Sequence, residues 1–262
     1  MRRLGSVLAM AALVAAGCAG HGEQRVVIAA GTTLVDSGFL QAVIDSYEVD
    51  HQDITMSVVP VGSAEAVAYA RAGSADIIIT HEPHVLATYL AEAPDATTTS
   101  PFASSFAVVA PPTANVDASD VVSAFRSVAL AEMTFVSRDD RSGTNVRERE
   151  IWELVGIDPV GENWYLRTGS GMGSSLLVAD QRSAVSLTEL GAFLTAAPAL
   201  NLAIVPLADT TALENPYAVT VPSPADSATA VAFQAWLSSE PGRAAIVDAN
   251  NRLFGTVVYR VP

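Results

Sequence analysis

Short apolar runs alternate along the chain with segments whose hydrophobic residues recur at helical spacing. The first unit has an apolar run at 26–30, a polar break at 31–33, and then Phe39, Leu40, Val43, Ile44 and Tyr47, which recur with helical spacing. The run predicts a buried strand and the spacing predicts a helix. Because this order recurs to the end of the chain, we predict an α/β fold with largely parallel sheets.

The same reading divides the chain into elements. We predict strands at 26–30, 54–59, 77–79, 106–110, 134–137, 184–187, 202–207 and 217–221. We predict helices at 39–47, 64–72, 84–92, 121–130, 145–155, 174–179 and 189–195, followed by two amphipathic helices around Phe233 and after Pro241. The polar segments between them, including the Thr/Ser-rich stretch before 106, are predicted as loops.

Three of the strand-to-helix loops are built from Gly, Ser and Thr, at 31–33, 137–144 and 169–174. Ligands of open α/β sheets bind outside the carboxyl ends of the strands, where helix N-termini offer unpaired N–H groups. Hydroxyls and glycine N–H groups at such positions suit an anion. Ser and Thr before a helix also serve as ordinary caps. One such loop alone favours capping, whereas three in one chain favour a binding site.

The second loop also carries two arginines, Arg138 and Arg141. An arginine directly after a strand can direct its planar guanidinium at two oxygens of an oxyanion, and Arg138 is the nearer of the two to the strand. Asp139 and Asp140 follow it, and they either hold that arginine in place or are solvated turn residues. Arg138 is therefore the candidate for the charged donor of the site.

Composition excludes several classes of protein. The formal net charge is -14, so nucleic acid is not an expected partner. All basic residues are arginines, which rules out a P-loop and lysine chemistry. His81 and His84 have no other predicted ligands near them, so no metal site is expected. A secreted serine-dependent ester hydrolase is the alternative from another class, but no G-x-S-x-G is present and every histidine precedes the candidate serines.

The N-terminus has the layout of a secretory signal. Arg2 and Arg3 precede an uncharged, mostly apolar run at 4–16, which is too short to span a membrane, and the single cysteine, Cys18, follows. We predict a lipoprotein signal peptide at 1–17, lipidation of Cys18 and a tether at 18–24. Simple secretion is the alternative. The mature protein would then be extracytoplasmic and anchored to the cell membrane by lipid.

From about residue 27 to residue 254 the chain resembles the periplasmic tungstate-binding proteins of ABC importers. The matching segments keep the family's order, and they are Asp36-Ser37-Gly38, Ser74-Ala75-Asp76, His81-Glu82-Pro83, Phe135-Val136-Ser137-Arg138, Ser142-Gly143-Thr144, Trp164-Tyr165, Gly171-Met172-Gly173 and Asn215-Pro216-Tyr217. The resemblance implies a two-lobed type II periplasmic binding protein fold, in which each lobe is a sheet flanked by helices and two crossing strands join the lobes. It places lobe 1 at 25–107 and 218–262 and lobe 2 at 108–217.

The resemblance further implies a monomeric solute-binding protein, not an enzyme, without cofactor or catalytic residues. It would capture tungstate, or molybdate, in the interlobe cleft and deliver it to the permease of an ABC transporter. The ligand-binding residues carried over from the family's motifs are Thr32, Thr33, Ser63, Arg138, Ser142, Thr144, Gly173 and Ser174.

Two features keep other oxyanions open as ligands. The family's threonine loop usually reads T-T-T-S-T, whereas this chain reads Ala30-Gly31-Thr32-Thr33-Leu34 and so lacks a hydroxyl on both sides. Phosphate keeps a proton near neutral pH and favours a site with a carboxylate acceptor, which Asp36, Asp139 or Asp140 could supply. Phosphate or another oxyanion is therefore the alternative ligand.

Overall fold

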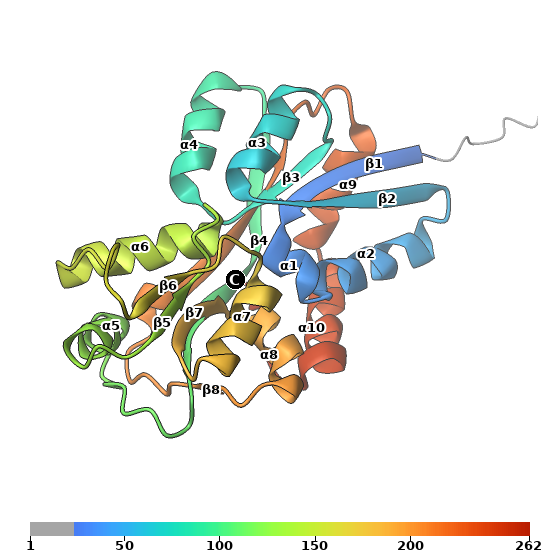
Figure 1. Cartoon of the computed structure of the whole chain (residues 1–262). Coiled ribbons are helices and arrows are strands. Elements are labelled where there is room, and N and C mark those ends of the chain that lie inside the picture. Colours follow the sequence, from blue (N-terminus) through green and yellow to red (C-terminus); the bar gives the residue numbers. More distant parts are fainter. Residues whose placement is uncertain (1–23) are drawn as a thin grey trace, which may run out of the picture.

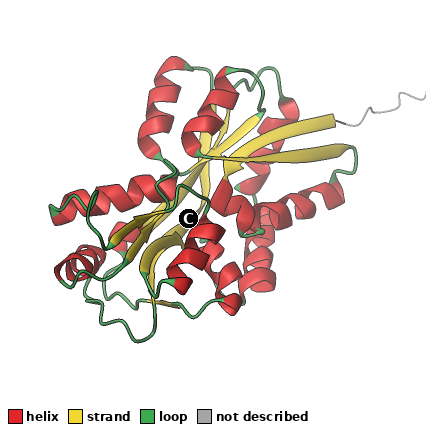
Figure 2. Ribbon diagram, in the orientation of Figure 1, coloured by secondary structure: helices red, strands yellow, loops and turns green. Residues whose placement is uncertain are grey.

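The structure, a computed structural model, describes residues 24–262; the predicted signal peptide, Cys18 and the tether up to residue 23 lie outside this part. Within it, one continuous sheet has helices packed on both faces (Figures 1 and 2). The strand order is β2-β1-β3-β9-β4-β7-β5-β6, with β8 paired to β4. The predicted α/β class is confirmed.

The strands are β1 (Gln24–Gly31), β2 (Ile54–Val61), β3 (Ile77–Thr80), β4 (Thr97–Ala110), β5 (Phe135–Ser137), β6 (Tyr165–Arg167), β7 (Val185–Glu189), β8 (Ala203–Ile204) and β9 (Glu214–Val221). The α-helices are α1 (Thr32–Asp36), α2 (Phe39–Asp50), α3 (Ser63–Arg71), α4 (Pro83–Glu92), α5 (Val121–Leu130), α6 (Gly143–Val155), α7 (Met172–Gln181), α8 (Leu190–Ala196), α9 (Ala228–Leu237) and α10 (Glu240–Phe254).

Strands β4 and β9 connect two halves of the sheet. The first half contains β1 to β3 with helices α1 to α4, α9 and α10, and the second contains β5 to β8 with α5 to α8. Strand β4 pairs with β9 from Thr97 to Ser105 and then with β7 from Phe106 to Val109. The predicted lobe boundaries after residues 107 and 217 stay a prediction.

The parallel part of the prediction holds within each half. Strands β1, β2 and β3 are parallel, as are β5, β6 and β7, whereas β4, β8 and β9 run antiparallel to their neighbours. Parallel strands with helices on both faces are buried on both sides and read as continuous apolar runs. In β1, Ile28 faces the cluster beneath α2, α9 and α10, and Ala29 faces the cluster beneath α3 and α4.

Aromatic rings form the centre of the second half. Phe125 of α5 lies 5.1 Å from Phe135 of β5 and 4.6 Å from Trp152 of α6, measured between ring centroids. All three side chains are almost fully buried. This packing fixes α6 against β5, and the loop between them therefore has two rigid ends.

Four predicted assignments were wrong. The threonine loop after β1 begins a helix, α1, and Tyr165–Arg167 forms β6, which was not predicted. Strand β4 begins at Thr97 within the predicted Thr/Ser-rich loop, because β-branched Thr residues pair there with β9. The strand predicted at 202–207 is reduced to Ala203–Ile204.

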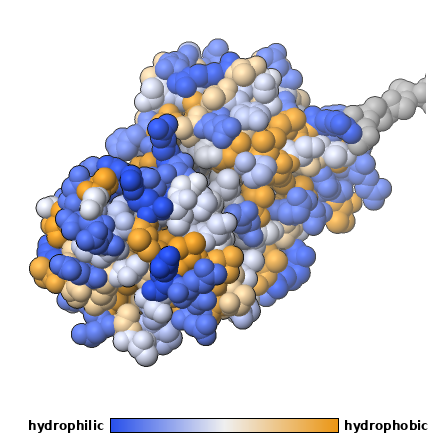
Figure 3. Space-filling model, viewed as in Figure 1, coloured by the Kyte–Doolittle hydropathy of each residue, from blue (hydrophilic) through white to orange (hydrophobic). Residues whose placement is uncertain are grey.

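The molecular surface is mixed in character. In Figure 3 hydrophilic residues cover much of the outer edges of this face, and hydrophobic residues gather mainly toward its middle. Among the described helices none is both long and apolar enough to cross a membrane. The chain ends beside β4, because Arg260 forms a bridge with Ala103.

Candidate functional site

The carboxyl ends of the parallel strands from the two halves face each other. Thr32 follows β1, Ser63 follows β2 after one residue, and Arg138 directly follows β5. The guanidinium of Arg138 reaches across to the first half, where its Nη2 donates to Thr32 Oγ1 at 3.5 Å. The structure thus brings together the loops at 31–33 and 137–144, as the sequence predicts.

Arg138 is the central cation of this region. Its side chain is only 3% exposed, and its Nε and Nη2 atoms donate to Asp140 Oδ2 at 3.0 and 2.5 Å. A buried guanidinium needs such a partner, since an unpaired buried charge is costly. Of the two interpretations of the acidic pair, Asp140 holds the arginine, whereas Asp139 forms an ion pair with Arg167 at 3.5 Å.

Two buried donors in the same region have no hydrogen-bond partner in the described chain: Arg138 Nη1 and Thr144 Oγ1. Buried polar groups are paired in the great majority of cases, so each exception needs an explanation. Ligand oxygens within hydrogen-bonding distance would supply the missing partners. The Asp140 carboxylate leaves this nitrogen free, so the ion pair and an added anion do not compete for the same atom.

The backbone of the loop after β5 is tightly turned. Asp139 and Arg141 both have positive φ values, 46° and 61°, which side-chain-bearing residues seldom adopt. Ser142 then caps α6 by accepting from Asn145 N, and its own N–H donates to Asp140 Oδ1. Ser142 is therefore an ordinary helix cap, which was the alternative for the Ser and Thr residues of these loops. Thr144 lies in the first turn of α6, and its hydroxyl has no hydrogen-bond partner among the described residues.

Two further helix starts, those of α3 and α7, have glycine caps. The N-cap residues of α3 and α7 are Gly62 and Gly171, and neither helix start receives a side-chain cap. The first N–H groups of a helix have no partner within the helix, and the positive end of its dipole favours an anion. Glycine caps leave these groups available to a ligand.

Thr33 and Ser63 are both 2% exposed and lie at the ends of β1 and β2. The Thr33 side chain is hydrogen-bonded to the Tyr217 hydroxyl, and Ser63 Oγ accepts from His81 N at 3.4 Å. Both predicted residues therefore lie in the first half, at the same carboxyl end of the parallel strands as Thr32. Their hydroxyls also have structural partners.

Gly173 and Ser174 lie at the start of α7 and are exposed. With Asp36, Met172 and residues of α8 they line a hollow of about 380 Å³. Burial raises the pKa of Asp36, and the charge of Arg138 partly opposes this shift. The α7 start is thus beside the Arg138 region but more open to solvent than the other predicted residues.

His81 takes part in the region although it is not among the ligand-binding residues predicted from the sequence. Its Nδ1 lies 2.9 Å from Asn215 Oδ1, and Asn215 Nδ2 donates to the Tyr217 hydroxyl at 3.3 Å. This arrangement turns Oδ1 toward His81, so Nδ1 carries the proton and Nε2 is an acceptor. Burial lowers the pKa of His81 to about 4, with a further lowering by Arg138, while the bond to Asn215 opposes both. The ring is therefore neutral.

Two buried carboxyl groups flank the same region. Glu148 of α6 accepts from Tyr165 Oη at 2.5 Å and from Ser137 Oγ at 2.7 Å. Glu189, at the end of β7, accepts from Ser104 Oγ and from Ala192 N. Burial raises the pKa of each to about 7, against these hydrogen bonds. Each group ties one end of a strand to a neighbouring element.

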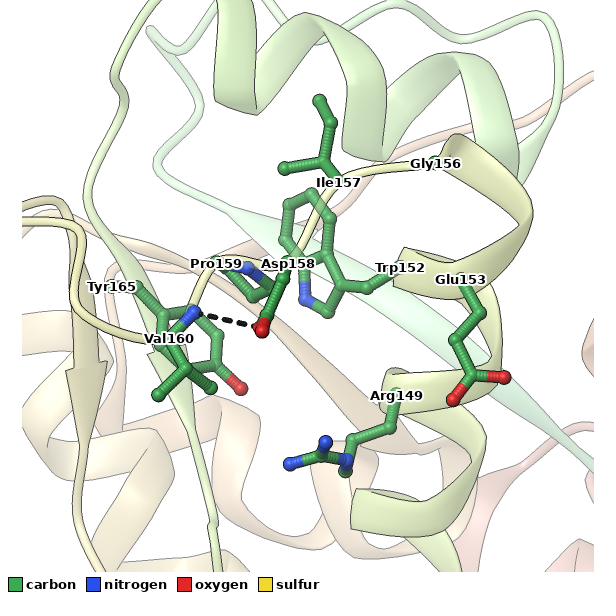
Figure 4. A pocket seen from close by; sticks show the side chains of 9 residues that line it. All are labelled: Arg149, Trp152, Glu153, Gly156, Ile157, Asp158, Pro159, Val160 and Tyr165. Atoms are coloured by element: carbon green, nitrogen blue, oxygen red, sulfur yellow. Dashed lines mark hydrogen bonds between the residues drawn. The ribbon is translucent and has the colours of Figure 1, made fainter.

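A second hollow, of about 330 Å³, lies away from the predicted residues. It is lined by Arg149, Trp152, Glu153, Gly156, Ile157, Asp158, Pro159, Val160 and Tyr165. Figure 4 shows apolar and charged side chains around Trp152 and Tyr165, with the Asp158 carboxylate accepting from the Val160 N–H. None of the ligand-binding residues predicted from the sequence lines this hollow.

Comparison with known proteins identifies the family. A model described as the PBP superfamily domain, the superfamily of periplasmic binding proteins, matches residues 19–241. The chain belongs to the PBP superfamily. A Haloferax volcanii protein assigned to anion binding in an ABC transporter is 33% identical over 232 residues, covering 84% of this chain and 67% of the relative. The tungstate-binding protein TupA of Peptoclostridium acidaminophilum is 28% identical over 283 residues, covering 99% and 98%.

Solved structures agree with this assignment. The crystal structure of the tungstate ABC transporter from Geobacter sulfurreducens matches with a TM-score of 0.76 and 26% identity, covering 87% of this chain and 99% of that chain. The type II periplasmic binding protein fold predicted for this PBP superfamily member is therefore confirmed, as is its resemblance to tungstate-binding proteins. These relatives are solute-binding proteins and not enzymes, which removes the basis for the hydrolase alternative.

Proposed function

We propose that this protein captures tungstate, with molybdate as a close analogue, in a cleft between two lobes and delivers it to the permease of an ABC importer. The observation that carries the proposal is the buried Arg138 guanidinium, whose Nη1 has no partner in the described chain and accompanies the unpaired Thr144 hydroxyl. The tungstate-binding relatives support the choice of ligand. The lobes would correspond to residues 25–107 with 218–262, and to 108–217.

The proposed ligand cage consists of donors from both halves. Arg138 and Thr144 would contact the anion through the two atoms that lack partners, and the starts of α3, α6 and α7 would add backbone N–H groups. The remaining proposed contacts are Thr32, Thr33, Ser63, Ser142, Gly173 and Ser174. Because Asp140 balances the charge of Arg138, the cage itself is neutral and binding depends on dipoles and hydrogen bonds.

Thermal unfolding with a panel of anions tests the proposal. Tungstate, molybdate, sulfate, phosphate and vanadate are each added to purified protein from which bound ions have been removed. A ligand at about 1,000 times its Kd adds about 4 kcal/mol to the native state, which for a chain of this size raises Tm by about 8–16 °C. We expect this shift with tungstate, an equal or smaller shift with molybdate and little with phosphate. A larger shift with phosphate would reassign the ligand.

An arginine pair supplies the matched variants. Arg138→Ala should abolish the tungstate shift, whereas Arg141→Ala removes an exposed arginine of the same loop and should retain it. The ligand-free Tm of each variant shows whether the fold is intact. A full tungstate response from Arg138→Ala would remove Arg138 from the site.

The membrane anchor is a separate part of the proposal. We propose that Cys18, which lies outside the described residues, carries the lipid. Cys18→Ala should move the protein from the membrane fraction to the soluble fraction of cells without changing the anion response. Continued sedimentation with membranes would favour another means of attachment.

A further inference from the structure

The two halves of the molecule meet at a histidine ring and a glycine. His81 follows β3 in the first half, and Gly143 is the first residue of α6 in the second. A Cβ atom added to Gly143 would lie 2.5 Å from both Cε1 and Nε2 of His81 and 3.1 Å from Cδ2. The two contacts of 2.5 Å are too close for a Cβ atom, so the backbone of α6 reaches the ring only because residue 143 has no side chain.

The His81 ring is held in place and cannot simply turn aside. Its Nδ1 bonds to Asn215 of β9, and its face stacks on the Tyr217 ring at a centroid distance of 5.2 Å and an interplanar angle of 18°. On the side of the first half, a Cβ on Gly31 would lie 3.6 Å from Cδ2 and Nε2. The ring therefore lies between the start of α1 and the start of α6.

These two helix starts carry the donors of the proposed site. Thr32 and Thr33 are the first residues of α1, and Thr144 is the second residue of α6. The His81 ring thus lies between the two sets of donors, and Gly143 approaches it without a side chain. No predicted ligand contact includes His81.

We propose that His81 is a positioning residue and that its contact with Gly143, as the structure has it, belongs to the closed form of the cleft, so that the ring fixes the spacing between the two sets of anion donors. This inference rests on the proposed function. It gives the segment His81-Glu82-Pro83 a role apart from ligand contact: the imidazole acts as a rigid spacer held by Asn215 and Tyr217. A side chain at residue 143 would keep the halves apart and leave the cage incomplete.

The effect should appear in the dissociation rate. An anion binds to the open cleft before the halves close, so the association rate depends little on the contact between Gly143 and His81. Loss of closure removes the contacts from one half and speeds release. We expect Gly143→Ala to weaken tungstate binding at least tenfold, mainly by faster dissociation, measured by stopped-flow and calorimetry.

A double variant separates the clash from other effects of the alanine. His81→Ala/Gly143→Ala removes the ring that the new Cβ would meet, so it should bind more tightly than Gly143→Ala and approach His81→Ala alone. His84→Ala/Gly143→Ala is the matched control, because His84 is exposed three residues further on and should restore nothing. Equal affinity of Gly143→Ala and wild type, or no recovery in the first double variant, would overturn the proposal.

Wild-type protein gives an independent measurement that needs no variant to fold. Diethyl pyrocarbonate modifies neutral imidazole nitrogens, and mass spectrometry reports the extent at each histidine. Tungstate should slow modification of His81 several-fold while leaving His84 unchanged, because closure covers Nε2 with Gly143. Unchanged modification of His81 under saturating tungstate would contradict the proposed contact between Gly143 and His81. A wild-type protein that binds no tungstate would instead refute the proposed function.

Discussion

The pH dependence of the free energy of unfolding tests whether two buried carboxyl groups of this protein have raised pKa values. Glu148 and Glu189 are 2% and 0% exposed, and burial raises the pKa of each from 4.5 to about 7. In the native state these groups hold their protons at a pH where the unfolded chain has lost them. Their contribution to stability is therefore fully present below about pH 4.5 and is lost as the pH rises through 7.

The size of this effect follows from the shifts. Between pH 5 and pH 8 each group should lower the free energy of unfolding by about 2–3 kcal/mol. The lowered pKa of His81 acts in the opposite direction, because stability from a neutral buried histidine is lost as the pH falls through 6.5 toward 4. His81 is unchanged in variants of the two glutamates, so its contribution cancels when each variant is compared with wild type.

Glu148→Gln and Glu189→Gln are the matching substitutions, since each keeps the shape of the side chain and cannot ionise. Urea unfolding of wild type and both variants at pH 5, 6, 7 and 8 measures the difference. Relative to wild type, each variant should gain about 2–3 kcal/mol from pH 5 to pH 8. A difference that stays constant across this range would mean that the carboxyl has an ordinary pKa and that burial does not raise it.

Two further substitutions test the ion pair and the core. Asp140→Asn should destabilise the ligand-free protein by about 3–5 kcal/mol in urea, because it leaves Arg138 buried without its counter-charge, whereas Asp139→Asn should change stability little; equal effects would contradict the assignment of Asp140. Phe125→Ala should cost about 3–5 kcal/mol through loss of a fully buried ring, and Leu130→Ala, 78% exposed on the same helix, less than about 0.5 kcal/mol; a small effect at Phe125 would place the core elsewhere.

Local patterns determine much of the fold. The helix predicted at 121–130 has those bounds in the structure, because its apolar face is distinct and Asp120 caps it by accepting from Ser123 N. The start of β4 was missed because its Thr and Ser residues carry no apolar pattern, and it becomes a strand only through pairing with β9. Helix α1 has five residues and no side-chain cap, so it lacks the signals that predict a helix.

The residues of the candidate site also differ in whether the local sequence can predict them. Arg138 could be predicted because its position directly after a strand is a local property of the sequence. The role of His81 could not, since Gly143 and Asn215 lie 62 and 134 residues away along the chain and only the folded topology brings them to the ring. No single segment of the sequence carries a pattern that indicates such long-range contacts. The missing side chain at Gly143 is visible in the sequence, but its meaning depends on what faces it.

The arrangement of carboxylates bears on the choice between tungstate and phosphate. Phosphate needs an acceptor for its proton, whereas tungstate and molybdate carry none at neutral pH. Asp140 Oδ2 accepts from Arg138 Nε and Nη2, Asp140 Oδ1 accepts from Ser142 N, and Asp139 is paired with Arg167, so protein donors already engage both carboxylates. Of the three carboxylates that left phosphate open, only Asp36 has neither hydrogen bond nor ion pair within residues 24–262, and it is exposed at the edge of the hollow beside α7. A free carboxylate at the rim repels a dianion weakly through solvent, but it does not supply the buried acceptor that a protonated phosphate requires. The donor set around Arg138 therefore supports an unprotonated oxyanion.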